Sequence, residues 1–357
     1  MSATLRHPEP PPPASPKAVG HGPQRAAWTH VLAVSVGLTA LLCLLVIAFA
    51  WPATQLAPRS LPVVVAGPVE ATAQVSAALD KAVPGGFAVT VVADEAAARA
   101  AIERRDAYGA ILLGPTPTVL TATAASPIVA QLLTQLATTL GARQGTAPPP
   151  TVQVVDVVPL PPADPRGLGL AALALPLVLG GLIVGGAMTA AISGVGRRVV
   201  GVVLTAVFAG AALTGIAHSW LGVMDGPWWA EAGVIALGIA AVGLTLVGLE
   251  ALFGIVGLGL GAAVIMLIGN PFSGMTSAPE MLPTGWATLG QWLPPGATGT
   301  LLRSVTFFDG AGGMRALWIL VGWVALGLAL AALGARRGRR DGRHGASVDP
   351  GLRPVAA

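Results

Sequence analysis

The residues from Gly167 to Gly334 are almost continuously apolar, and no other feature of the sequence restricts the possible folds as strongly. Of the 357 residues, 54% are hydrophobic and 10% are charged, whereas ordinary soluble domains carry roughly 25% charged residues. A water-exposed surface needs more charge than this. A helix of about 20 apolar residues, by contrast, crosses the ~30 Å hydrocarbon core of a bilayer. The sequence therefore predicts an integral membrane protein and excludes a purely soluble enzyme.

The apolar runs predict six transmembrane helices. The first covers residues 28–51, and the others cover Leu168–Ile192, Val199–Trp220, Ala230–Leu249, Phe253–Ile268 and Arg315–Gly334. The boundary between the fourth and fifth helices is the least marked, because only Glu250, Gly254 and Gly257 interrupt the apolar run there. A cleaved signal peptide ending at Ala50 is an alternative for the first helix. Its apolar run exceeds the usual 7–15 residues, which favours a retained membrane anchor.

Both ends of the sequence are predicted to be cytoplasmic tails. Residues 1–27 are rich in proline and cannot bury a core, so we expect a disordered segment. Residues 335–357 hold six of the 20 lysines and arginines, which is typical of an anchor beside anionic lipid. The basic residues form no patch of the kind that a folded nucleic-acid-binding domain presents. Membrane lipid is therefore an expected partner, and nucleic acid is not.

Residues 52–166 differ from the rest, because charges of both signs appear and short β-rich runs alternate with helical ones. This pattern predicts an inserted extracytoplasmic α/β domain of roughly 115 residues, which is enough for its own core. The expected strands are Leu61–Ala66, Phe87–Ala93, Ala107–Leu113, Val119–Ala124 and Val152–Leu160. The expected helices are Val69–Val83, Asp94–Asp106 and a third from Pro127 to about Arg143.

The basic residues beside the spans predict the orientation. Arg197 and Arg198 lie between the second and third spans, the C-terminal arginines follow the sixth, and Lys17 and Arg25 precede the first. With six spans, all three positions fall on one side, which the positive-inside rule assigns to the cytoplasm. We therefore expect a multi-pass protein of a bacterial plasma membrane, with both termini in the cytoplasm. The α/β domain and residues 270–313 are expected outside.

The sequence lacks the motifs of intrinsic enzymatic chemistry. Its two lysines, Lys17 and Lys81, do not follow the Gly-rich pattern that cradles phosphates. There is no H-E-x-x-H helix or G-x-S-x-G elbow, and the single cysteine, Cys43, lies in an apolar run. We expect no enzyme activity and no catalytic, metal-binding or cofactor-binding residues in this chain.

Residues 270–313 form an amphipathic insert before the last span. Its prolines, among them Pro271, Pro279, Pro283 and Pro294, make one continuous helix unfavourable, so we expect short interfacial or re-entrant helices that close the outer end of a pathway. In this interpretation, Arg303 and Asp309 pair with each other or hold a lipid headgroup. The alternative is a connector, although connectors beyond 12–15 residues are usually functional or disordered. The residues of this candidate outer gate are Asn270, Pro271, Trp286, Trp292, Arg303 and Asp309.

Three charged residues are candidates on the cytoplasmic side. Arg197 and Arg198 are typical of a topology signal, and their guanidinium groups also suit a carboxylate-lined surface on a partner ATPase. Glu250 is expected to cap a tight hairpin between the fourth and fifth spans. A proton or cation relay is the alternative, because charge within hydrocarbon is costly and often functional.

The layout resembles a known family. The expected outer domain ends in Val157-Val158-Pro159-Leu160-Pro161, followed by Asp164-Pro165-Arg166-Gly167 where the chain enters the membrane. With one span before this domain, five after it and a Pro-rich insert before the last, the chain is similar to ABC transporter permeases of the type-2 exporter class. It most resembles the actinobacterial and firmicute branch that overlaps with the YhgE/Pip-like membrane proteins.

The resemblance implies a permease subunit that forms a homodimer or a heterodimer with another permease. A separate cytoplasmic ATPase subunit would hold the ATP, and the substrate would be a hydrophobic or amphipathic molecule moved outward. Such permeases usually carry an elbow helix before the first span and a coupling helix between the second and third. Here the first tail is Pro-rich and the loop is only Gly194-Val195-Gly196-Arg197-Arg198. A second interpretation therefore stays open, a non-transporting YhgE/Pip-like scaffold whose outer domain binds a partner or a cell-wall component.

Overall fold

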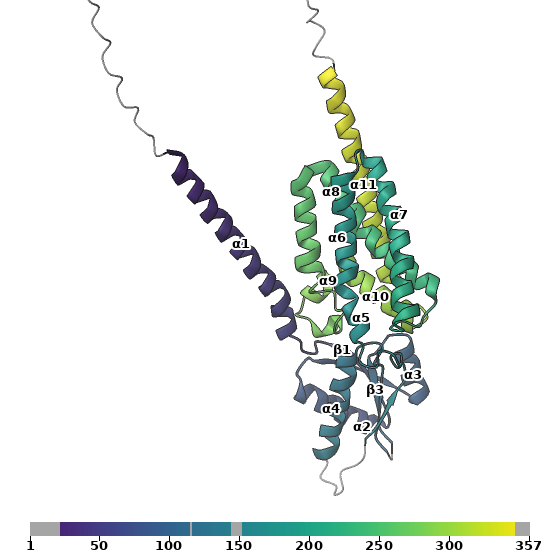
Figure 1. Cartoon of the computed structure of the whole chain (residues 1–357). Coiled ribbons are helices and arrows are strands. Elements are labelled where there is room, and N and C mark those ends of the chain that lie inside the picture. Colours follow the sequence, from purple (N-terminus) through teal and green to yellow (C-terminus); the bar gives the residue numbers. More distant parts are fainter. Residues whose placement is uncertain (1–21, 115, 144–151, 347–357) are drawn as a thin grey trace, which may run out of the picture. The chain divides into compact units, whose positions relative to one another are not determined.

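The computed structural model describes residues 22–114, 116–143 and 152–346 (Figure 1). The Pro-rich tail up to residue 21 and the basic tail beyond residue 346 lie outside the described residues. The chain divides into two compact units, Met1–Ile47 and Ala48–Ala357. Helix α1 (Gly22–Thr54) crosses from the first unit into the second. It contains the expected first span, but it begins six residues earlier than predicted, within the segment expected to be disordered.

Five helices in the described part of the chain are long and apolar enough to span a membrane. The first lies in α1, and α5 (Leu168–Ala172) with α6 (Ala174–Ala191) forms the second. Helix α7 (Val195–Thr214) continues into η1 (Gly215–Trp220), and α8 (Trp228–Val264) continues into η2 (Ile265–Gly269). The last is α11, Met314–Ala346, which runs 12 residues past the predicted boundary at Gly334 into the expected basic tail.

The predicted fourth and fifth spans form one stretch that reverses direction. Gly254, with φ 66° and ψ −155°, interrupts the helical backbone of α8. Gly261, seven residues beyond this point, lies against Leu246 and Leu249, which precede it. The stretch therefore consists of two antiparallel arms joined at Gly254. At 1.5 Å per residue the second arm, 255–269, is roughly 22 Å long, shorter than the ~30 Å hydrocarbon core. The expected fifth span is thus a short arm rather than a separate full-length helix.

Close contacts at glycines define the directions of the bundle helices. On α6, Gly181 lies against Val242 and Gly185 against Leu246, so α6 runs parallel to the first arm of α8. Helix α11 is also parallel to that arm, because Gly327 lies against Leu244 and Gly334 against Ala251. Small residues allow this close approach of helix backbones in membranes. The directions place the start of α7, the α8 reversal and the end of α11 at one end of the bundle, here called the basic end.

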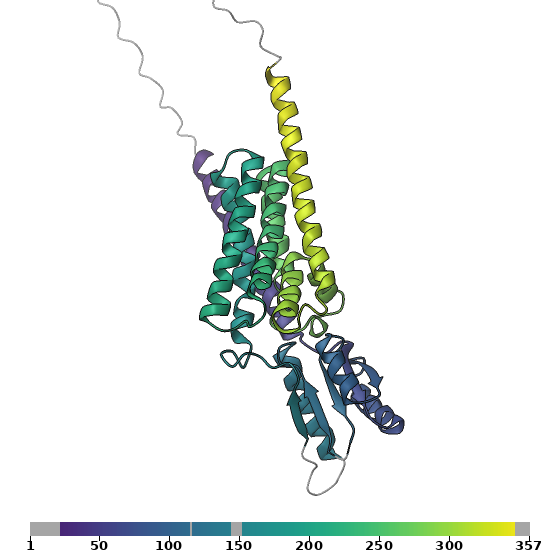
Figure 2. The same ribbon diagram turned by 90° about the vertical axis from the view of Figure 1, so that its right-hand side faces the viewer.

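The described residues between 61 and 156 form a five-stranded sheet with three helices, here called the sheet region (Figure 2). The strand order is β2-β1-β3-β4-β5; β3 and β4 are antiparallel and the other neighbours are parallel. The predicted strands and helices are confirmed, with ends that differ from the predicted ones by up to four residues; β4 and α3 end three residues early and β5 ends four residues early. Their bounds are β1 Leu61–Ala66, α2 Val69–Ala82, β2 Phe87–Val92, α3 Glu95–Glu103, β3 Gly109–Leu112, β4 Thr118–Thr121, α4 Pro127–Arg143 and β5 Gln153–Asp156.

The sheet region and the bundle belong to the same compact unit, Ala48–Ala357. The two views agree that the sheet lies at the end of the bundle opposite the basic end (Figure 1 and Figure 2). The residues expected to form an inserted domain thus do not separate as a compact unit of their own. The reason lies in the insert, residues 270–313, whose side chains enter the core of the sheet region.

The insert forms three short helices, as the prolines predict. These are η3 (Pro279–Met281), α9 (Trp286–Trp292) and α10 (Pro294–Phe307). Pro279 and Pro294 occupy first-turn positions, where a missing N–H costs nothing. Met281 packs with Leu61 and Val63 of β1, while α10 is buried along most of its length. The insert therefore joins the sheet region to the bundle.

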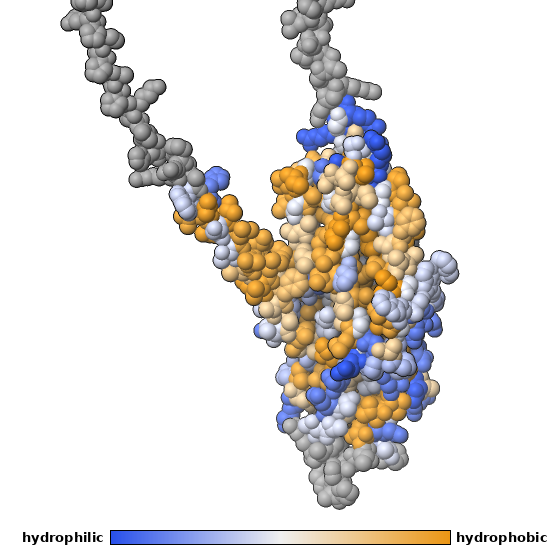
Figure 3. Space-filling view, in the orientation of Figure 1, coloured by the Kyte–Doolittle hydropathy of each residue, from blue (hydrophilic) through white to orange (hydrophobic). Residues whose placement is uncertain are grey.

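Figure 3 shows apolar residues covering the bundle, with hydrophilic residues gathered at the end of α11 and over the sheet region. Exposed large apolar side chains lie on α7, on both arms of α8 and on α11, among them Phe208, Phe253, Ile255, Leu260 and Trp318. An apolar surface of this extent would be unfavourable in water and suits contact with lipid tails.

Candidate functional site: an arginine-lined cavity beside the bundle

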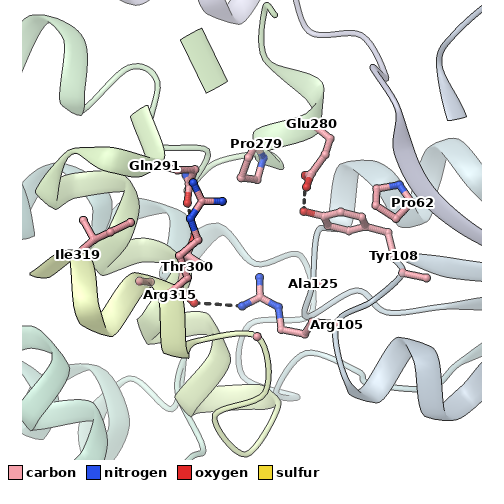
Figure 4. Close-up of a pocket in the computed structure, with 13 residues that line it drawn as sticks. Pro62, Arg105, Tyr108, Ala125, Pro279, Glu280, Gln291, Thr300, Arg315 and Ile319 are labelled. Carbon is pink, nitrogen blue, oxygen red and sulfur yellow. Dashed lines mark hydrogen bonds between the residues drawn. The ribbon is translucent and has the colours of Figure 1, made fainter. Parts of the chain in front are cut away.

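A cavity of about 240 Å³ lies where the sheet region, the insert and α11 meet (Figure 4). Its lining residues come from all three parts and include Arg105, Tyr108, Glu280, Gln291 and Arg315. A second cavity of about 380 Å³ shares Pro279, Glu280, Gln291 and Arg315 with the first and adds Arg59. The two cavities therefore adjoin along shared walls, and we call them together the arginine-lined cavity.

Tyr108 and Glu280 connect the sheet region to the insert inside this cavity. The Tyr108 hydroxyl donates to Glu280 Oε2 at 2.7 Å, across 172 positions of sequence. Burial raises the pKa of Tyr108, and the neighbouring Glu280 carboxylate raises it further. The phenol therefore keeps its proton and remains a donor. Backbone bonds support the contact nearby, because Arg59 N donates to Glu280 O at 2.9 Å.

Arg105 occupies a backbone position that usually holds glycine. It follows α3 with φ 61°, and its N–H donates to Ile102 O while Asp106 N–H donates to Ala101 O. These two bonds form a Schellman motif, in which the left-handed position strongly favours glycine. A non-glycine residue there costs of order 1 kcal/mol, so the arginine side chain is retained at some expense to backbone stability.

The Arg105 guanidinium reaches from the sheet region to α10. Its Nη1 donates to Thr300 O at 3.1 Å and to Ser304 Oγ at 2.5 Å, and the group lies 5.3 Å from the centre of the Phe308 ring. Burial lowers the pKa of Arg105, while Tyr108 and Glu280 oppose this shift. Arg105 thus presents a partly desolvated positive charge to the cavity.

Positive charge predominates in and beside the cavity. Arg59, Arg105 and Arg315 line it, against one carboxylate, Glu280. Arg303 of α10 is buried beside them; its Nη2 donates to Met275 O at 2.8 Å, and its Nε has no hydrogen-bond partner among the described residues. Within the described ranges, none of these four arginines lies in an ion pair. The site therefore suits an anionic group.

Arg315 connects the cavity to an exposed apolar face of α11. It lies in the first turn of α11, and its guanidinium is 5.3 Å from the centre of the Trp292 ring. Arg315 also lines an apolar groove of about 450 Å³ on the exposed face of α11. The other residues of this α11 groove are Trp292, Trp318, Ile319, Gly322, Trp323 and Leu326.

The residues predicted as an outer gate separate into different surroundings. Trp292 lies at the α11 groove, and Arg303 lies beside the arginine-lined cavity, as described above. Trp286 stacks on Phe272 at 4.7 Å between ring centres, and Trp51 packs edge-on against both rings. Asn270 and Pro271 line another cavity, of about 400 Å³. The insert therefore does not bring all six candidates to one point.

Arg303 and Asp309, expected to pair with each other or to hold a lipid headgroup, form no ion pair with each other. Asp309 is exposed, with φ 49°, and forms no ion pair within the described residues. Arg303 is instead buried and bound to the Met275 carbonyl. Asp309 lies past the end of α10, where the chain turns toward α11, so its carboxylate is held away from the guanidinium.

At the basic end, Arg198 and Glu250 form an ion pair, with 17% and 20% of their side chains exposed. Arg197 and Arg198 lie in the first turn of α7 rather than in a loop. At the start of a helix, positive charge opposes the helix dipole. Arg198 also donates to Ile192 O at 2.7 Å, whereas Arg197 is exposed and reaches only Ser193 Oγ at 3.4 Å. Glu250 lies four residues before the reversal at Gly254, and its carboxylate is engaged by Arg198.

The residues that line the cavity were not singled out from the sequence. Arg59, Arg105, Tyr108 and Glu280 lie in different segments, with no spacing that relates them. Arg315 carried one signal, since a charged residue next to the start of an apolar span and near tryptophans marks a membrane interface. The contacts across 172 and more positions could come only from the fold.

No family model, no curated protein and no solved structure matches this chain.

Proposed function

We propose that the chain is the permease subunit of an exporter in a bacterial plasma membrane, which moves an amphipathic molecule outward. The observation that carries this proposal is the arginine-lined cavity. It lies between the sheet region and the short helices of the insert, beside an apolar bundle. In this proposal the sheet region is an inserted extracytoplasmic domain and both termini are cytoplasmic. The exposed arginines of the basic end, Arg336, Arg337 and Arg339, then face anionic lipid in the cytoplasmic leaflet.

The arginine-lined cavity and the interior of the bundle differ in volume, and this difference supports the proposed arrangement. The pocket between α6, α8 and α10 has a volume of about 10 Å³, which is too small for an amphiphile. The two parts of the arginine-lined cavity have volumes of about 240 and 380 Å³, and the α11 groove has a volume of about 450 Å³. The two larger volumes lie in the size range of small-molecule sites. A substrate would therefore bind at the lipid-facing side of α11 rather than inside the described bundle.

The energy source in this proposal is a separate cytoplasmic ATPase, and Arg197 is the group that this chain offers to it. Arg197 is exposed, whereas Arg198 is engaged with Glu250 and Ile192 O. The permease would act as a homodimer or heterodimer. The chain itself supplies binding and a path, with no enzymatic chemistry of its own.

Purification from the native host in mild detergent tests this proposal. A tagged full-length chain is expected to bring down an ATPase, and an Arg197→Glu variant, which reverses the exposed charge, is expected to lose it. Arg337→Glu, an exposed charge reversal on α11, is the control and should retain the ATPase. Repeated isolation without an ATPase, together with unchanged efflux in a deletion strain, would contradict the exporter proposal.

A non-transporting scaffold is the second candidate. The observation in its favour is the basic end, where the link between α6 and α7 is only Ile192–Gly194 and offers no coupling helix. In that case the sheet region would bind a partner or a cell-wall component. Isolation of a stable extracellular partner, with no ATPase, would support this alternative.

A further inference from the structure

The α11 groove follows one face of a membrane helix. Its α11 residues are Arg315, Trp318, Ile319, Gly322, Trp323 and Leu326. Their spacing of three and four positions repeats with the period of an α-helix, so they form a continuous stripe. From Arg315 to Leu326 the stripe is about 16 Å long at 1.5 Å per residue. That length equals about half of the ~30 Å hydrocarbon core, which is one leaflet.

The chemistry changes along this stripe as it does along a lipid. Arg315 lies in the first turn of the candidate span Met314–Arg339, and it also lines the arginine-lined cavity. C-terminal to Arg315 along α11, Trp318, Trp323 and Leu326 form the apolar walls of the groove. Trp292 closes the groove from α9, held by the Trp323 indole, which donates to Trp292 O at 2.8 Å. The polar cavity and the apolar groove therefore meet at one guanidinium.

Gly322 makes the stripe concave. No atom lies within 4 Å of the position that a Cβ would occupy there, so the missing side chain leaves open space in the middle of the groove. The lining is almost entirely apolar below Arg315. An acyl chain fits both the shape and the chemistry of this surface.

We propose that this surface binds one anionic amphiphile, with its acyl chain in the α11 groove and its phosphate or carboxylate group between Arg315 and Arg105. The unpaired positive charge of the cavity selects the anionic headgroup, and the length of the groove selects a chain that occupies one leaflet. Calling this ligand the exported substrate rests on the proposed function. Its binding does not depend on an ATPase and is measured without one.

Native mass spectrometry of the purified full-length chain tests the proposal. The probes are a phosphatidylglycerol and a phosphatidylcholine with identical acyl chains, titrated into a detergent that strips bulk lipid. We expect one phosphatidylglycerol to be retained at concentrations that leave phosphatidylcholine unbound. Arg315→Gln should weaken phosphatidylglycerol binding about tenfold, because a charge-assisted contact is lost. Arg99→Gln, which removes an arginine that pairs with Glu95 on α3 and lines neither the cavity nor the groove, should leave it unchanged.

The acyl chain is tested by filling the groove. Gly322→Leu places a side chain in open space on a helix and is expected to fold normally while abolishing retention of phosphatidylglycerol. Gly338→Leu is the matched control, because Gly338 also has no atom within 4 Å of its Cβ position and lies near the other end of α11. Melting temperatures of both variants close to that of the wild type would show that the fold is intact.

The outcomes separate the two proposals. Equal binding of both lipids, or full binding by Arg315→Gln or Gly322→Leu, would overturn the amphiphile site. Displacement of phosphatidylglycerol by glycerol 3-phosphate at a similar concentration would identify a soluble anion as the ligand and would also overturn it. Specific lipid binding without any ATPase partner or efflux would leave the site established and the exporter proposal contradicted.

Discussion

Individual arginines in this protein have different roles, which depend on the backbone conformation and the charges around each of them. Arg105 stands where glycine is favoured, and its side chain crosses to α10. An outlier of this kind persists only where the surrounding structure determines it, and such outliers gather at functional sites. Arg105 is therefore the residue that most directly identifies the cavity as a site.

Arg197 and Arg198 are adjacent in sequence, yet the structure predicts opposite consequences for their removal. Arg198→Ala leaves the Glu250 carboxylate half-buried without its partner, so we expect a loss of about 1–3 kcal/mol of stability. Arg197→Ala removes an exposed side chain and should change stability by less than about 0.5 kcal/mol. Thermal unfolding in detergent measures both. Glu250→Ala in the Arg198→Ala background should recover part of the loss; equal melting temperatures for the two single variants would contradict this assignment.

The helices and strands were predicted from the sequence more completely than the contacts between them. The strands at 61–66 and 87–92 were expected from β-rich runs and α3 from a helical run. The structure adds that Asp94 caps α3, because its Oδ1 accepts from Ala97 N at 2.8 Å. Such signals are local. The contact of Tyr108 with Glu280 has no local signal, and neither does the packing of Met281 in the core of the sheet region. The cavity therefore could not be predicted, because residues from three segments form it.

The reversal of α8 depends on one glycine. Gly254 has φ 66° and ψ −155°, a combination that only glycine adopts readily, while no atom lies within 4 Å of its Cβ position. Gly254→Ala should therefore cost about 1–3 kcal/mol through the backbone alone. Gly233→Ala, on the same helix with equally open surroundings, should instead stabilise the protein by about 0.5–1 kcal/mol. Melting temperatures that shift in the same direction for both would refute this explanation.

For the whole molecule, the arrangement of the helices predicts a simple labelling pattern. The start of α7, the α8 reversal and the end of α11 share one end, and the sheet region lies at the other (Figure 2). In intact cells, cysteine at the exposed position Asp80 should react with an impermeant maleimide, while cysteine at Arg339 should react only after the membrane is opened. The native Cys43, within an apolar span, gives the background. Labelling of Arg339→Cys in intact cells would reverse the proposed orientation.

The short second arm of α8 also bears on the surrounding bilayer. An apolar segment of roughly 22 Å does not match a hydrocarbon core of ~30 Å, and a membrane responds to such mismatch by thinning locally, at a cost of fractions of a kcal/mol per Å. Lipids beside this arm would be compressed, so the protein would favour shorter acyl chains in its annulus. Its distribution among membranes of different thickness would then follow from the placement of Gly254 in the sequence.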